Sequence, residues 1–289
     1  MEFYQRVLEI ADRYDAFLLD LWGVIHDGAT AYPEVHGALE SIKKAGKKII
    51  FLSNAPRRAA KAVEGLERLQ IGAELYDHVV TSGEVAYERL CARNLRAFNI
   101  AGDRFFYIGP ERDAGLLDGT AYQRVDEAKD AHFVVVTGYD QDSSPIDEKM
   151  QQLEESLKYK LPLVCANPDL VIVRITGVRA YCAGVIAQQY EEMGGVVQYF
   201  GKPYPGVYRK SLALLGDMPT ERIAAIGDSL ITDIKGANSM GIDSYLIAGG
   251  ILGEALGIQH GQLPDPKALL EVCQSENIMP KGVLPALTW

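Results

Sequence analysis

Short, mostly apolar segments alternate with amphipathic ones along this chain, and that alternation limits the folds open to it. Residues 16–20 (AFLLD) and 47–52 (KKIIFL) are candidate strands, and the segment between them places apolar residues at helical spacing. A strand that is apolar on both faces needs cover on both sides, which helices provide in a parallel sheet. The pattern therefore predicts an α/β fold with a doubly wound parallel sheet.

The same alternation continues to the end of the chain. We expect helices over residues 2–13, 34–46, 57–69 and about 146–158, and two more that begin near residues 205 and 232. We expect further strands at residues 78–81, 104–108, 132–137, 170–174, 196–200, 222–227 and 243–247. We find no internal repeat and no low-complexity linker, so composition alone marks no domain boundary.

The composition excludes several classes of protein. The 289 residues are enough for one large domain or two ordinary ones, and 48% hydrophobic with 24% charged residues is typical of globular proteins. The 29 basic and 39 acidic residues give a net charge of −10, which argues against a general nucleic-acid or membrane-surface binder. A local basic pocket for a small phosphate ester remains compatible with this balance.

Cysteine usage and hydropathy indicate a cytoplasmic protein. The four cysteines, at positions 91, 165, 182 and 273, are far apart and form no C-x-x-C pair, so we expect neither a disulfide framework nor a structural zinc site. The first fifteen residues lack the apolar core of a signal peptide, and no stretch approaches about 18 apolar residues. We therefore expect a reducing cytoplasm and no membrane partner.

Carboxylate and hydroxyl side chains follow three of the predicted strands. Asp20 ends the first strand, Ser53 ends the second, and Asp228 follows the strand at 222–227, with Asp233 five residues later. Ligands of open α/β sheets bind beyond the carboxyl ends of the strands. If these strands are neighbours, the four residues meet at one edge and offer the hard oxygen ligands that magnesium prefers.

Each of these residues also has a simpler interpretation. An aspartate at a strand end is often a turn former or a helix N-cap, and Ser53-Asn54-Ala55-Pro56 reads equally well as a turn. Lys202, in the segment Gly201-Lys202-Pro203, is either a solvated lysine or a cation that balances Asp20 and a bound phosphate. The segment is not a Walker A loop, because it lacks the Ser/Thr and the first glycine.

Four segments, taken in order, resemble the motifs of a known family. DLWGV (20–24), FLSNAPR (51–57), GKPYPGVY (201–208) and IGDSLITDIKGA (226–237) resemble motifs I to IV of the haloacid dehalogenase (HAD) superfamily. The long segment between motifs II and III resembles the C2a cap of the class IIA phosphatases, as do TSGEVA (81–86) and ANPD (166–169). The resemblance implies a HAD-like core of residues 1–81 and 199–289, with an α/β cap domain of residues 82–198 inserted.

The resemblance also implies roles for individual residues. Asp20 would be the nucleophile that takes the phosphoryl group, and Lys202 would pair with that nucleophile and with the phosphate. Ser53 would bind the phosphate with help from the backbone of Asn54. A magnesium ion would be held by Asp20, the main-chain carbonyl of Trp22, Asp228 and Asp233. Asn167 and Asp169 of the cap would reach the substrate.

The match to the family breaks at Trp22. Phosphatases of the family carry a second aspartate at this position, which protonates the leaving oxygen and later activates water. An indole has a donor N–H only and no usable pKa near neutrality. Acid–base help typically contributes about 10²–10⁴-fold to a rate. His26 and Asp27 follow closely, and they are either partial substitutes for the missing acid or plain loop residues.

These features lead to one main functional prediction and two alternatives. The main prediction is a magnesium-dependent phosphatase that acts on a small phosphomonoester, such as a sugar phosphate or a nucleotide, through an aspartyl phosphate. The first alternative is a weakened relative that binds a phosphorylated ligand for regulation, because Trp22 replaces the acid. The second is a receiver-type domain phosphorylated on Asp20, against which the long insertion and the GKP segment argue. The resemblance also implies a homodimer formed through the cap.

Other charged residues carry weaker predictions. Arg57 and Arg58 follow motif II, while Arg174 and Arg179 lie in the predicted cap, and each either grips an anionic substrate or points into solvent. The remaining histidines show no metal-ligand spacing, and we expect structural roles for them.

Overall fold

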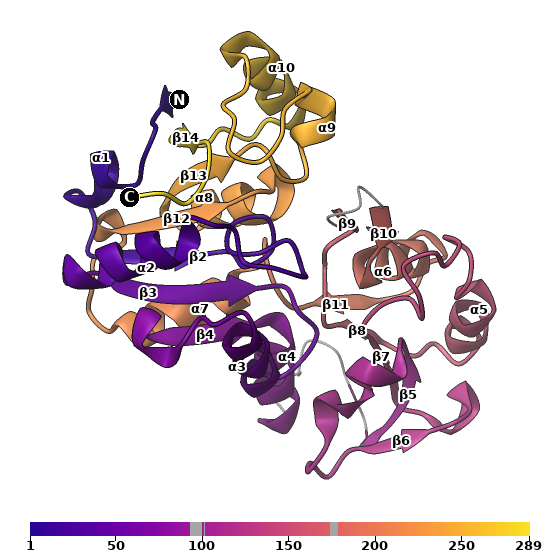
Figure 1. Ribbon diagram of the computed structural model, residues 1–289. Helices are drawn as coiled ribbons and strands as arrows, with labels where there is room; N and C mark the ends of the chain where they lie inside the picture. Colours follow the sequence, from indigo (N-terminus) through magenta and orange to yellow (C-terminus); the bar gives the residue numbers. More distant parts are fainter. Residues whose placement is uncertain (93–99, 101, 174–178) are drawn as a thin grey trace.

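The computed structural model describes residues 1–92, 100, 102–173 and 179–289, which form two parallel sheets and a hairpin (Figure 1). All neighbouring strands of the first sheet are parallel. Their order is β1 (Glu2–Phe3), β14 (Gly282–Leu284), β13 (Asp243–Ile247), β12 (Ile223–Gly227), β2 (Ala16–Leu19), β3 (Lys48–Ser53) and β4 (His78–Thr81). The three strands whose ends carry Asp20, Ser53 and Asp228 (β2, β3 and β12) therefore lie side by side, which meets the condition for these residues to converge.

Helices cover both faces of the first sheet because successive residues of β2 point to opposite sides. Phe17 and Leu19 pack with α2 (Val35–Lys44) on one face, whereas Ala16 and Leu18 join the cluster that contains α7 (Pro205–Leu215). The other helices of this part are α1 (Leu8–Ala11), α3 (Ala59–Arg68), α8 (Lys235–Ser239), α9 (Gly253–Leu256) and α10 (Pro266–Glu276), with the π-helix η6 (Leu230–Ile234) and the 3-10 helices η1 (Ala73–Leu75) and η5 (Thr220–Arg222).

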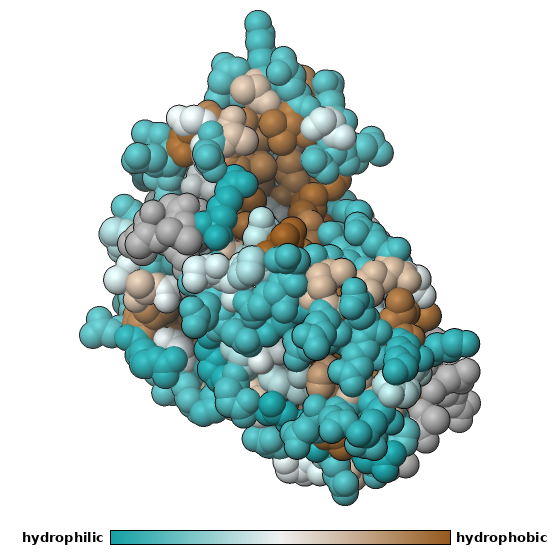
Figure 2. Space-filling view, turned by 90° about the vertical axis from the view of Figure 1, so that its right-hand side faces the viewer, coloured by the Kyte–Doolittle hydropathy of each residue, from teal (hydrophilic) through white to brown (hydrophobic). Residues whose placement is uncertain are grey.

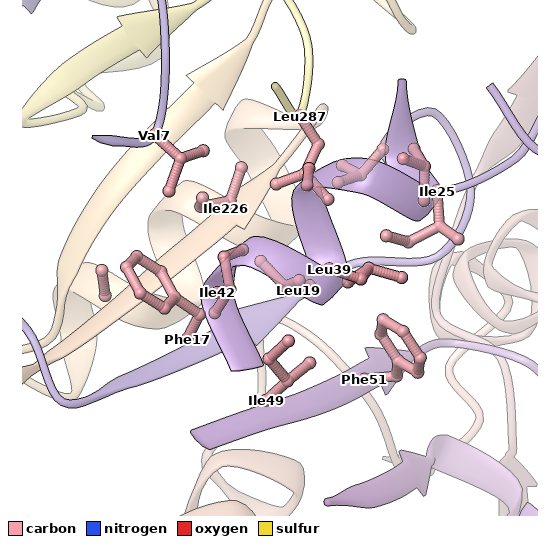
Figure 3. Close-up of a cluster of buried hydrophobic side chains, with 14 of the residues drawn as sticks. Val7, Phe17, Leu19, Ile25, Leu39, Ile42, Ile49, Phe51, Ile226 and Leu287 are labelled. Atoms are coloured by element: carbon pink, nitrogen blue, oxygen red, sulfur yellow. The ribbon is translucent and has the colours of Figure 1, made fainter. Parts of the chain in front are cut away.

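The helix α2 is stabilised by the apolar side that it packs against the first sheet. Leu39 and Ile42 are fully buried and lie on one side of α2, against Phe17, Ile49 and Phe51 of the sheet (Figure 3). Burying such a side chain contributes about 1.5–3 kcal/mol. Replacing Leu39 with alanine would leave a cavity here and cost about 2–5 kcal/mol.

The second sheet lies between motifs II and III and is also parallel. Its order is β11 (Val197–Tyr199), β8 (Leu163–Cys165), β7 (Phe133–Val136), β5 (Arg104–Ile108) and β6 (Gln123–Val125). The helices α5 (Met150–Lys158) and α6 (Ala183–Glu192) pack on one face, with η4 (Ala128–Asp130). The opposite face joins the core of the first sheet, together with α4 (Ser82–Cys91) and η3 (Glu111–Leu117).

This architecture confirms the predicted α/β class with a second α/β unit inserted into the first. The boundaries of the expected cap, residues 82–198, stay a prediction. The structure adds that α4, which lies inside those boundaries, buries Val85 and Leu90 in the same cluster as Val207 of α7. The strands β9 (Val171–Val173) and β10 (Arg179–Tyr181) are antiparallel and form a separate two-stranded sheet.

Two of the predicted elements differ from the structure. The expected helix over residues 2–13 is wrong for its first half, because Glu2 and Phe3 form β1 and pair with β14 near the other end of the chain. Only Leu8–Ala11 is α-helical there. The strand expected near residues 170–174 is β9, but its partner is β10 rather than a parallel neighbour.

The surface on the side of the second sheet is mostly hydrophilic, while hydrophobic residues gather in the upper part of that view (Figure 2). None of the helices in the described ranges combines the length and the hydropathy that a membrane crossing requires.

Candidate active site

Three buried carboxylates meet at the carboxyl edge of the first sheet. Asp20 directly follows β2 and Asp228 directly follows the adjacent β12, while Asp233 lies in η6 behind them. One ligand oxygen from each lies within 4.8 Å of those of the other two. The parallel register of β2 and β12 brings the first two together, which is the convergence that the sequence predicted.

Lys202 binds two of these carboxylates. Its Nζ donates to Asp20 Oδ1 at 2.6 Å and to Asp233 Oδ1 at 2.7 Å, and its side chain is 3% exposed. Burial alone would lower the pKa of Lys202, but the charges of Asp20 and Asp233 outweigh it and raise the pKa. Lys202 therefore stays protonated and fixes the orientation of the Asp20 carboxylate.

The cluster holds three carboxylates against one lysine, which leaves an excess of negative charge. Burial raises the pKa of Asp20 to about 7, with Lys202 opposing the rise and Asp233 adding to it. Burial also raises the pKa of Asp228, and Asp20 adds to that effect. Such a set of buried oxygen donors fits a divalent cation, which would relieve the repulsion.

Glycines shape the pocket around Asp228. A Cβ at Gly23, where φ is +78°, would lie 2.2 Å from Asp228 Oδ2, and one at Gly250 would lie 2.0 Å from the same atom. The Asp228 carboxylate thus packs between the backbones of Gly23 and Gly250, where no side chain intervenes. It accepts a hydrogen bond from the Ile251 N–H at 3.1 Å. Gly23 is the residue after Trp22, whose carbonyl the resemblance implies as a metal ligand.

Asn54 holds the loops of the site together through its side chain. Its Oδ1 accepts the Lys202 N–H at 2.7 Å, and its Nδ2 donates to the Lys202 carbonyl at 3.0 Å and to Asp169 Oδ1 at 2.7 Å. The neighbouring Ser53 ends β3 and accepts the Ala55 N–H at 3.2 Å. The family resemblance implied a role for the Asn54 backbone only. It did not indicate these bonds of the side chain, because they join residues 148 positions apart.

The loop after β8 reaches the site as the sequence expected. Asn167 Oδ1 accepts the Asp169 N–H at 3.1 Å, which orders the turn that presents the Asp169 carboxylate to Asn54. Gly201, with φ of +119°, allows this approach, because a Cβ there would lie 2.7 Å from Pro168 Cδ. Ser82 also donates to the carbonyl of Ala166.

Trp22 occupies the position where the family's acid would stand. Its indole packs against Gly28, where a Cβ would lie 2.2 Å from the ring, and meets the His26 ring edge-to-face at 5.6 Å. Burial lowers the pKa of His26 to about 4, and its Nδ1 accepts the Gly28 N–H at 3.0 Å. Asp27 accepts the N–H groups of Ala29 and Thr30 in a turn. Both residues act in the loop, and neither lines the cavity described next.

A cavity of about 200 Å³ lies between the two sheets. Residues of the first sheet and its loops line its floor: Asp20, Trp22, Ser53, Asn54, Lys202 and Asp228. Residues of the second sheet's loops line its roof: Asp113, Thr137, Tyr139, Gln141, Asn167 and Asp169. Most of the roof residues carry no sequence signal, because they lie on loops whose spacing matches no motif.

Three of the four arginines considered as substrate ligands form ion pairs within the protein. Arg57 lines the cavity, and its Nη2 lies 2.9 Å from Asp113 Oδ1, so it links the two units while 43% of its side chain stays exposed. Arg58 binds Glu84, and the exposed Arg179 of β10 binds Glu254 of α9 at 2.8 Å. Arg174 lies outside the described residues.

The sequence and the fold of this chain match a known protein family. The model of the haloacid dehalogenase-like hydrolases matches residues 17–123, and a second, HAD-hydrolase-like model matches residues 199–268. A crystal structure of a haloacid dehalogenase-like hydrolase from Brucella suis 1330 is 32% identical, with a TM-score of 0.83, over 99% of this chain and 100% of that one. The chain belongs to the haloacid dehalogenase-like hydrolase family.

Two curated relatives within this HAD family are named as phosphatases. D-glycerol 3-phosphate phosphatase of Mycobacterium tuberculosis is 27% identical over 84% of this chain, and the match spans 65% of that protein. The acid sugar phosphatase of Staphylococcus epidermidis is 25% identical over 82% of this chain and 88% of that protein. These matches confirm the resemblance to the class IIA HAD phosphatases.

One solved HAD structure bears on the metal. A glycerol phosphate phosphatase from M. tuberculosis, crystallised in complex with calcium, is 26% identical with a TM-score of 0.63, over 84% of this chain and 68% of that one. The carboxylate cluster of the present chain has the chemistry for a divalent cation of this kind.

Proposed function

We propose that this HAD hydrolase is a magnesium-dependent phosphatase that hydrolyses a small phosphomonoester, such as a sugar phosphate or a nucleotide, through an aspartyl phosphate on Asp20. The observation that carries the proposal is the bond from Lys202 Nζ to Asp20 Oδ1, within a cluster that also contains Asp228 and Asp233. This arrangement presents an oriented carboxylate nucleophile on the floor of a cavity.

In the proposed phosphoryl transfer, each residue of the site has its own role. Asp20 attacks the phosphorus, Lys202 neutralises charge on Asp20 and on the phosphate, and Ser53 donates a hydrogen bond to a phosphate oxygen. Magnesium, held by Asp20, Asp228 and the Trp22 carbonyl with support from Asp233, would neutralise the charge that develops on the phosphoryl oxygens. Phosphoryl transfer needs positioning and charge neutralisation above all, and these groups supply both.

The cavity and the relatives support a small substrate. A space of about 200 Å³ suits a compact organic phosphate rather than a macromolecule. Gln141 offers a polar side chain on its roof, which suits a hydroxylated leaving group. The named relatives act on glycerol phosphate and sugar phosphates.

A screen of phosphorylated metabolites with magnesium tests this proposal. We expect phosphate release from a subset of sugar, polyol or nucleoside phosphates, and loss of that release in Asp20→Asn, which keeps the size of the side chain. Circular dichroism of both proteins controls for folding. Equal release by the folded Asp20→Asn variant would contradict the assignment of the nucleophile.

A second candidate function rests on Trp22. Because an indole cannot protonate a leaving oxygen, the chain would then bind a phosphorylated ligand and turn it over poorly. p-Nitrophenyl phosphate separates the two candidates, because its leaving group needs little protonation. Ligand binding without turnover of this ester would favour the regulatory candidate.

The cytoplasmic location and the homodimer stay predictions. Analytical ultracentrifugation of the full chain tests the latter, with twice the monomer mass of 31.7 kDa as the expected result.

A further inference from the structure

The tryptophan at position 22 leaves the proposed reaction without the family's usual proton donor, so another group in the cavity would have to supply the proton. Besides the metal-site cluster, the described residues place the carboxylates of Asp113, Asp142 and Asp169 on its wall. Asp113 is engaged by Arg57 at 2.9 Å, and Asp142 lies on an exposed loop. Asp169 differs from both, because its loop is bonded directly to the motif II residue beside Ser53.

A chain of contacts links Asp169 to the nucleophile. Asn54 Nδ2 donates to Asp169 Oδ1 at 2.7 Å, and the same amide group grips the backbone of Lys202. Lys202 Nζ in turn holds Asp20 at 2.6 Å. Asn54 occupies one oxygen of the Asp169 carboxyl, and no hydrogen bond within the described part of the chain occupies its Oδ2. This oxygen is therefore available to a group bound in the cavity.

We propose that Asp169 is the general acid–base of this hydrolase, supplied by the loop after β8 in place of the residue that Trp22 replaces. The inference rests on the proposed function. It assigns the proton transfer to a residue on the roof of the cavity, where the leaving group of a phosphate bound at Asp20 would lie.

The proton balance of both steps closes with this residue. In the first step, Asp20 forms a bond to phosphorus, the bond from phosphorus to the leaving oxygen breaks, and protonated Asp169 gives its proton to that oxygen. In the second step, the Asp169 carboxylate takes a proton from water as the water attacks phosphorus. The bond to Asp20 breaks, and Asp169 is protonated again.

The burial of Asp169 favours the protonated form that the first step needs. Burial raises the pKa of Asp169, while the positive charge of Lys202 and the hydrogen bond from Asn54 oppose the rise and Asp233 adds to it. The negative charge of Asp169 in turn raises the pKa of Asp20. A raised pKa is the property expected of a carboxyl that must donate a proton near neutrality.

The variant Asp169→Asn tests the proposal, because its amide oxygen still accepts the Asn54 hydrogen bond but cannot titrate. We expect kcat/KM for glycerol 3-phosphate, whose alkoxide leaves badly, to fall about 10²–10⁴-fold. We expect kcat/KM for p-nitrophenyl phosphate, which reports the first step alone, to stay within about threefold of wild type, since this leaving group needs little protonation. We expect kcat to fall on both esters where the second step limits turnover, because the variant can no longer take the proton from water. Glu254→Gln is the matched control, because it removes another contact between the two units, to Arg179, without changing the cavity. It should leave both rates unchanged.

Equal losses of kcat/KM on both esters would show a structural role for Asp169 and overturn the proposal, as would an unchanged kcat/KM on glycerol 3-phosphate. A wild type that cleaves neither these esters nor any other phosphate in the screen would overturn the proposed function itself. The wild type alone gives a second test if Asp169→Asn does not fold. With a working acid, rates across a series of esters depend weakly on leaving-group pKa, and a steep dependence would contradict the inference.

Discussion

At the scale of single residues, Trp22 has a structural role that accounts for its size. Its ring packs against Gly28 and the edge of His26, so it closes the loop that follows the nucleophile. A smaller side chain would leave a space there that costs a few kcal/mol. In the proposed reaction, the proton that an indole cannot supply would come from Asp169 instead.

The variant Trp22→Asp in the Asp169→Asn background tests whether position 22 or position 169 supplies the proton. The new carboxyl stands where relatives of the family carry their acid, so we expect glycerol 3-phosphate turnover to recover at least about tenfold relative to Asp169→Asn, within the usual range of acid–base help. Thermal unfolding must first show that the double variant folds. The absence of any recovery in a folded protein would mean that position 22 cannot deliver a proton to the leaving oxygen.

At the scale of elements, the loop after β3 and the 3-10 helix η3 are joined by one ion pair. Arg57 Nη2 lies 2.9 Å from Asp113 Oδ1, and the Asp113 side chain is only 5% exposed. We expect Arg57→Ala to lower the free energy of unfolding by about 1–3 kcal/mol, because it leaves a buried carboxylate without its partner. Urea denaturation measures this loss, and a cycle with Asp113→Asn isolates the pair.

Arg112→Ala is the control for this ion pair. Arg112 is 56% exposed and its Nε lies 3.8 Å from Asp113 Oδ2, so its removal should cost less than about 0.5 kcal/mol. If the two arginine variants lose equal stability, the pair does not hold the units together as described.

The sequence predicted those elements whose signal is local. The apolar runs of β2, β3, β12 and β13 and the motifs at their ends were enough to place Asp20, Ser53 and Asp228 together. β1 was misread as helix because Glu2 and Phe3 take their conformation from β14, about 280 positions away. The residues that line the roof of the cavity could not be predicted for the same reason. Asp113 and Tyr139 line it only because the second sheet packs over the first.

At the scale of the whole molecule, metal binding should couple to stability. The excess negative charge of Asp20, Asp228 and Asp233 lies in the middle of the fold, so a ligand that neutralises it stabilises the folded state. Magnesium at 100 times its Kd would add about 2.7 kcal/mol. We expect magnesium to raise the melting temperature of wild type and to lose this effect in Asp228→Asn. The same shift in both proteins would place the metal elsewhere.

The central claim is that Asp20 carries the phosphoryl group, and chemical trapping tests it most directly. The enzyme is mixed with a cleavable phosphate ester and magnesium, quenched in acid during turnover, and reduced with borohydride, which converts an aspartyl phosphate to homoserine. Mass spectrometry of the peptides then locates the modified residue. We predict homoserine at position 20 in wild type and none in Asp20→Asn. Turnover without homoserine at position 20, or with the modification at another carboxylate, would contradict the account.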